Sequence, residues 1–254
     1  MHVVVIHRWP EVTAELAQAL AAALEVTAFD ARQRLIGGGP AVVGSFADSH
    51  QARALAEKLQ KSGFAGFVLD ALAVRSSAGS FVVRRFELGE GALRIEAADG
   101  RRGEIAYGEI DLLLPCTCIA GHTESRTVTE RKFSMGRTLL AGGVPLTKKV
   151  NRREEVTTEE REEALYLFAG RRPPVVLPQN GLAYDGLGAA MELSRELNFA
   201  YLKSELRRLS PDAIHDERLL KRPGQVRLLG PALNPETNLD LAVSILARSL
   251  RRAG

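Results

Sequence analysis

Val3-Val4-Val5-Ile6 is the stretch of sequence that decides the fold of the first part of the chain. A short run of β-branched residues predicts a buried strand. Trp9-Pro10 ends this run, because proline interrupts regular pairing. The chain is therefore expected to open with a core strand.

Three helices and two more strands are predicted after it. Each helix has a capping residue followed by a repeating apolar stripe. The helices are expected at 14–24 after Thr13, at 28–36 after Thr27, and at 51–61 after Asp48 or Ser49. Gly37-Gly38-Gly39 ends the second helix and is no phosphate cradle, since the Lys-Ser/Thr of a P-loop does not follow it. Strands at 41–46 and 64–69 complete the order βααβαβ.

This order over residues 1–72 resembles the C-terminal domain of the bacterial ribosomal stalk protein, a fold shared with the Clp protease adaptor. The likeness also rests on residues 29–35 (FDARQRL), 52–59 (ARALAEKL) and Gly63. The resemblance implies a domain that docks on a protein partner. A rival resemblance, to half of a peptidoglycan-binding repeat domain, rests on residues 42–46 (VVGSF). The N-terminus lacks the pattern of an export signal, which argues against that rival.

Beyond a short polar linker at 76–80, the apolar period shifts toward two, which indicates strands. Strands are expected at 81–88, 92–97, 103–107, 110–119, 164–169 and 174–178, followed by a helix at 195–209 capped by Ser194. This pattern resembles a pleckstrin-homology-like domain. Asn234-Pro235-Glu236 is expected to start a final helix.

The predicted fold class is α+β. An N-terminal βααβαβ domain (1–75) precedes a mainly antiparallel β domain (80–222) that is closed by an amphipathic helix, and a helical extension follows (223–254). The 34 Lys and Arg against 31 Asp and Glu leave a charge of +3, which does not by itself indicate nucleic-acid binding. No apolar run is long enough to cross a bilayer. Two cysteines, expected to be reduced thiols, fit a cytoplasmic protein.

A charged insertion at about 121–163 is the most unusual segment. Residues 126–153 hold eight basic residues and one acid, whereas residues 154–163 hold six acids and one arginine. The candidate residues for an anion or an acidic partner are Lys132, Arg137, Lys148, Lys149, Arg152 and Arg153. Two interpretations stay open: the basic part pairs with the acidic part that follows it, or it binds an external anion.

The sequence contains no recognisable catalytic constellation, because its five histidines lie apart from any nucleophile or acid pair. Cys116, Cys118 and His122 are weak candidates for zinc, with His2 or His7 needed as a fourth ligand. No cofactor is expected. The leading hypothesis is a non-enzymatic adaptor with a protein partner, and the alternative is a nucleic-acid or ribosome-associated protein that uses the basic residues.

Overall fold

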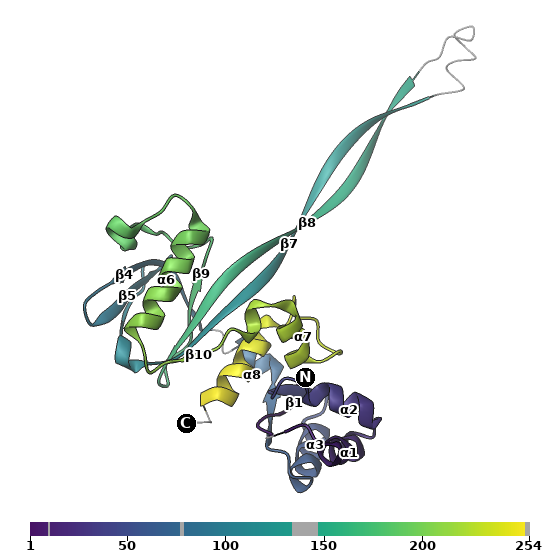
Figure 1. Cartoon of the computed structure of the whole chain (residues 1–254). Coiled ribbons are helices and arrows are strands. Elements are labelled where there is room, and N and C mark those ends of the chain that lie inside the picture. The colour runs from purple at the N-terminus through teal and green to yellow at the C-terminus, as the bar shows by residue number, and fades with distance from the viewer. Residues whose placement is uncertain (10, 77–78, 134–146, 252–254) are drawn as a thin grey trace. The chain divides into compact units, whose positions relative to one another are not determined.

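The computed structural model describes residues 1–9, 11–76, 79–133 and 147–251, and for 75–76, 119–133 and 147–160 it describes the backbone only. The first elements are β1 (His2–Ile6), α1 (Ala14–Leu24), α2 (Ala28–Leu35), β2 (Ala41–Phe46), α3 (Ser49–Lys61), β3 (Gly66–Asp70) and α4 (Ala71–Ser76) (Figure 1). The predicted order βααβαβ is confirmed over residues 2–70.

Strand β1 is the centre of the first sheet, whose order is β2-β1-β3 with both pairs antiparallel. Its side chains alternate between two cores: Val4 and Ile6 pack in the core under α1 to α3, and Val3 and Val5 pack in another. All four are fully buried. Burial on both faces explains why this strand reads as an unbroken β-branched run.

The predicted helix caps are confirmed by their hydrogen bonds. Thr13 Oγ1 accepts from Leu16 N at 3.2 Å, Thr27 Oγ1 from Asp30 N at 3.1 Å, Asp48 Oδ1 from His50 N at 2.9 Å, and Ser194 Oγ from Leu197 N at 3.4 Å. The chain leaves α2 through Gly37, Gly38 and Gly39 at φ of 105°, 73° and 71°, which are left-handed values that favour glycine.

The second sheet has seven strands in the order β10-β7-β8-β9-β4-β5-β6. The remaining elements are β4 (Phe81–Leu88), β5 (Ala92–Ala97), β6 (Arg102–Ala106), η1 (Tyr107–Glu109), β7 (Ile110–Phe133), β8 (Thr147–Ala169), β9 (Val175–Pro178), η2 (Asp185–Ala190), α6 (Arg195–Leu209), β10 (Ile214–His215), η3 (Arg218–Leu220), α7 (Arg222–Leu229) and α8 (Leu239–Arg251). The pairs β10–β7 and β4–β9 are parallel. None of the helices in the described ranges combines the length and apolarity needed to cross a membrane.

Several predicted boundaries were wrong. Helix α4 occupies residues up to Ser76, where the polar linker was expected to begin. The final helix starts at Leu239 and not at Asn234, because Asn234 forms a turn in which its Oδ1 accepts from Glu236 N and its carbonyl from Asn238 Nδ2. Helix α7 and the two-residue strand β10 were not predicted.

Helix α8 lies in a core that joins both sheets. Leu246 and Ile245 of α8 are fully buried and share one cluster with Val3 and Val5 of β1 and with Leu112 and Leu114 of β7. On β7 and β8 the alternate side chains belong to a second cluster with Phe199, Leu202 and Leu206 of α6. Strands β7 and β8 therefore have apolar packing on both faces at residues 110–116 and 164–169.

The chain divides into two compact units. The larger unit, which we call the body, consists of residues 1–118 and 162–254, and the smaller unit consists of residues 119–161. The second unit nearly coincides with the predicted insertion. There β7 and β8 continue as strands and wind about each other (Figure 1). The predicted domain boundaries within the larger unit stay predictions.

Replacing Leu246 by alanine should lower the free energy of unfolding by about 2–5 kcal/mol, because a buried leucine leaves a cavity in a close-packed core. Since the core joins both sheets, the fluorescence of Trp9, the single tryptophan, should change at lower urea together with the far-ultraviolet circular dichroism. Leu197→Ala is the matched control, because Leu197 is 58% exposed on α6. An unchanged Trp9 transition in Leu246→Ala would contradict a shared core.

Candidate functional site

Five of the six predicted anion-binding residues lie on the ribbon, which we define as residues 119–133 of β7 with 147–161 of β8. Lys132 is the penultimate residue of β7, and Lys148 and Lys149 follow the first residue of β8. Because the two strands are hydrogen-bonded neighbours joined by residues 134–146, their ends at 133 and 147 belong to one end of the ribbon. Arg152 and Arg153 are a few residues further along β8. Arg137 lies outside the described residues.

The last two residues of the acidic stretch at 154–163 belong to the body, and both form hydrogen bonds there. Glu163 Oε2 accepts from Lys203 Nζ of α6, and the Glu163 amide donates to Gln179 Oε1 at 3.1 Å. Glu162 Oε1 accepts from the Asn180 amide at 2.9 Å. These two acids therefore have partners in the body of the protein.

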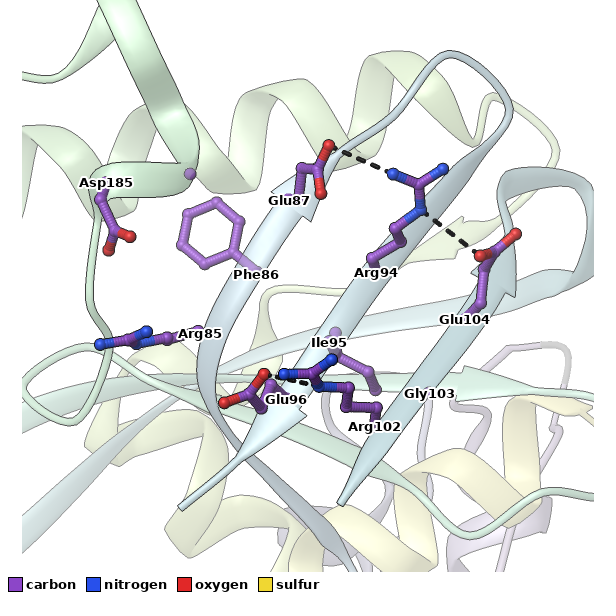
Figure 2. A pocket seen from close by; sticks show the side chains of 11 residues that line it. Arg85, Phe86, Glu87, Arg94, Ile95, Glu96, Arg102, Gly103, Glu104 and Asp185 are labelled. Atoms are coloured by element: carbon purple, nitrogen blue, oxygen red, sulfur yellow. Dashed lines mark hydrogen bonds and ion pairs between the residues drawn. The ribbon is translucent and has the colours of Figure 1, made fainter. Parts of the chain in front are cut away.

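A second candidate site is a cavity of about 590 Å³ on the outer face of β4, β5 and β6, closed on one side by η2 (Figure 2). The pattern Arg-x-Glu occurs once in each strand, as Arg85-Phe86-Glu87, Arg94-Ile95-Glu96 and Arg102-Gly103-Glu104. Since side chains alternate along a strand, each arginine and glutamate point to the same face. Phe86 and Ile95 point to the core.

The strand register places each of these arginines beside a glutamate of the neighbouring strand. We call this arrangement of six alternating charges the checkerboard. Glu87 pairs with Arg94 across β4 and β5, and Arg94 with Glu104 across β5 and β6. Arg94 accordingly reaches Glu87 at 3.3 Å and Glu104 at 3.5 Å, and Arg102 reaches Glu96 at 2.9 Å. Glu87 is the main cause that raises the pKa of Arg94. These pairs are largely exposed, so each adds little stability.

Arg85 and Asp185 flank the same cavity, and in the described part of the chain neither forms an ion pair (Figure 2). Counting both, three arginines face four carboxylates, so the cavity has no excess of positive charge. It is therefore unsuited to a free phosphate or a nucleic-acid backbone. The repeated Arg-x-Glu pattern is the sequence signal that indicates this face.

The two cysteines lie on β7 at the core that joins both sheets. Cys116 is fully buried, Cys118 is half-buried, and the Cys116 thiol lies 3.5 Å from the Ala164 carbonyl oxygen. A hydrogen bond between the thiols raises the pKa of Cys116, to which burial adds, and lowers the pKa of Cys118. Close by, Tyr166 donates to Asp240 Oδ1 of α8 at 3.2 Å, and burial raises the pKa of Tyr166.

The proposed zinc ligands are only partly brought together. Cys116 and Cys118 are adjacent, whereas His2 begins β1 and the His7 ring packs on Phe67 with centroids 5.5 Å apart. The backbone of His122 lies in β7, outside the described side chains. Among the side chains that are described, no three His, Cys, Asp or Glu residues gather as metal ligands.

The checkerboard can be tested by exchanging charges. Arg94→Glu should lower the Tm, because three carboxylates then lie side by side, and about 1 M KCl should remove most of the difference by screening. Adding Glu87→Arg and Glu104→Arg to the same chain should restore the Tm, since opposite charges again face each other. If the triple variant melts below Arg94→Glu, the cross-strand pairing is not what stabilises this face.

The sequence matches no known family model, and neither a curated protein nor a solved structure is significantly similar to it. The resemblances to the stalk protein, the Clp adaptor and the pleckstrin-homology-like domain therefore stay predictions.

Proposed function

We propose that this chain is a non-enzymatic binding protein and that the ribbon docks on double-stranded nucleic acid through its basic end. The proposal rests on the two-stranded structure of the ribbon and on the position of its basic residues. The predicted insertion consists of two long neighbouring strands, and the basic residues gather where these strands are joined.

The basic end of the ribbon has an electrostatic cost that an external polyanion removes. Lys132, Lys148 and Lys149 lie within two residues of the strand ends that meet there. Like charges on neighbouring strands destabilise a sheet. Residues 126–153 include one acid, Glu130, among eight cations, so positive charge is in large excess in this part of the segment. A phosphate backbone supplies closely spaced negative charges and gains entropy from released counterions.

The acidic half of the segment does not fully offset this excess. Glu162 and Glu163 are engaged with Asn180, Gln179 and Lys203 in the body. This engagement favours the second of the two interpretations of the charge pattern, in which the cations bind an external anion.

The shape of the ribbon favours a duplex over a single strand. A two-stranded β-ribbon fits the major groove of B-form DNA, which is about 12 Å wide, and several DNA-binding proteins use strands in this way. Single-strand binders need aromatic side chains on which bases stack. Phe133 is the one Phe, Tyr or Trp between residues 119 and 161, so the ribbon offers a single aromatic side chain on which a base could stack.

A protein-docking adaptor is the second candidate, and one observation favours it. Phe29 of α2 is 70% exposed and Ile36, directly after α2, is 41% exposed. Contiguous exposed apolar patches mark protein–protein interaction sites, and these two residues lie in α2 and directly after it. In this alternative the N-terminal domain would carry the interaction and the ribbon would be secondary.

Changing the five basic residues of the ribbon should weaken duplex binding steeply. The substitutions are Lys132→Gln, Lys148→Gln, Lys149→Gln, Arg152→Gln and Arg153→Gln. Each phosphate contact adds about −0.9 to the slope of log K against log salt, so the unchanged chain should show a slope of about −4 to −5 between about 50 and 200 mM KCl. The quintuple variant should bind at least about 100-fold more weakly, with a clearly shallower slope. Fluorescence anisotropy with a labelled duplex measures both.

A matched control removes the same charge from the body. Its substitutions are at exposed positions, namely Arg53→Gln, Lys61→Gln, Arg171→Gln, Arg207→Gln and Lys221→Gln. This variant should retain most of the affinity and the slope. Equal losses in both variants would mean that only net charge matters. If neither variant changes binding while Phe29→Ser abolishes capture of a protein partner from nuclease-treated extract, the adaptor function replaces this proposal.

A further inference from the structure

Strand β6 lies at one edge of the seven-stranded sheet, because the strand order ends with it. All five of its residues pair with β5 in one continuous register. Hydrogen bonds from Tyr107 N to the Gly91 carbonyl and from Ala97 N to the Arg101 carbonyl flank this pairing at its two ends. In an antiparallel pair, residues bonded in this way occur at every second position. The backbone groups of the even-numbered residues in 102–106 therefore point away from the sheet.

One hydrogen bond agrees with this outward direction. The Glu104 carbonyl accepts from Arg172 Nη1 at 2.9 Å, and Arg172 lies between β8 and β9. A carbonyl oxygen has two lone pairs, so this one can accept a second hydrogen bond. Backbone groups that point outward from a sheet edge are a template on which another strand can pair.

The charges on this edge are complementary to themselves. Arg102 and Glu104 lie two residues apart on one face of β6, with 80% and 63% of their side chains exposed. When two copies of β6 pair in antiparallel through their outward backbone groups, Arg102 of one copy can face Glu104 of the other. Twofold symmetry then repeats this contact, and Gly103 on the axis has no side chain that could clash. The two neighbouring registers face arginine with arginine or glutamate with glutamate, which destabilises the pairing.

The same register continues the checkerboard from one copy into the next. Two rows of alternating charge cross the three strands of one chain, namely Glu87–Arg94–Glu104 and Arg85–Glu96–Arg102. The first row of one copy meets the second row of the other where Glu104 faces Arg102, so the signs alternate over all six positions. Charged side chains, lysine above all, usually protect an edge against association. An edge with both signs in this order attracts a second copy.

We infer that β6 is a homodimer interface, in which two copies of this chain pair in antiparallel and Arg102 of each copy faces Glu104 of the other. Such an interface is isologous, because the same surface of both copies forms it. A five-residue strand buries less area than the about 1,200–2,000 Å² of a stable complex, so the dimer is weak and forms at high concentration. Strand β6 belongs to the body, and the dimer does not depend on duplex binding by the ribbon.

The test is sedimentation equilibrium of the nuclease-treated full chain from about 1 µM to about 1 mM, the range of weak complexes. The unchanged chain should shift from monomer to dimer within this range. Arg102→Glu and Glu104→Arg should each associate at least about 10-fold more weakly, because like charges then face each other. An equimolar mixture of the two variants should recover most of the association, since the acidic edge of one faces the basic edge of the other.

The matched control is Arg53→Glu, which makes the same charge change at an exposed position of α3. It should associate like the unchanged chain. Circular dichroism checks the fold of each variant, because Arg102→Glu also places a glutamate beside Glu96. If a charge reversal unfolds the chain, Arg102→Gln takes its place and should weaken association at least about threefold.

Three results would overturn the inference. The unchanged chain could stay a monomer up to about 1 mM, which means that the edge does not pair. Both reversals could dimerise as well as the unchanged chain, which would place the interface elsewhere. Folded variants that stay apart in the mixture would show that Arg102 and Glu104 do not meet.

Discussion

The packing of α8 against both sheets is the interaction on which the rest of the structure depends. Its buried side chains, Leu246 among them, fill one core with Val3 and Val5 from β1 and with Leu112 and Leu114 from β7. The opposite faces of β7 and β8 pack on α6. Residues 119–161, in which the same two strands continue, form a compact unit of their own.

Charge is distributed in two different ways over the β domain. On β4, β5 and β6 the Arg-x-Glu repeats and the strand register alternate the signs, so that the face is nearly self-neutral. On the ribbon the signs are separated along the chain, and part of the acidic half is bound to the body. Charges of alternating sign neutralise one another locally, whereas a cluster of one sign creates an electrostatic potential that attracts a partner of opposite charge. This contrast is the reason to look for the binding surface on the ribbon.

The sequence predicted the elements that depend on local chemistry. The four helix caps, the glycine stop after α2 and the alternating strands from 81 to 119 each rest on residues a few positions apart. Features that depend on distant pairing were missed. Residues 120–133 are too polar to show strand periodicity, and they became a strand only through pairing with β8. The turn at Asn234 resembles a cap locally, and the helix position is instead set by packing of α8 in the core.

The candidate site was predicted in part. The six basic residues were proposed from charge alone, and the position of five of them on neighbouring strands could not be read from spacing. The nearness of Tyr166 and Asp240 to the thiols depends on contacts between β7, β8 and α8, which no local pattern encodes. The most direct test of duplex binding by the ribbon is amide hydrogen exchange of the full chain with and without a short DNA duplex. Slower exchange confined to residues 119–133 and 147–161 is predicted. Protection centred on residues 28–36, with none on the ribbon, would contradict it.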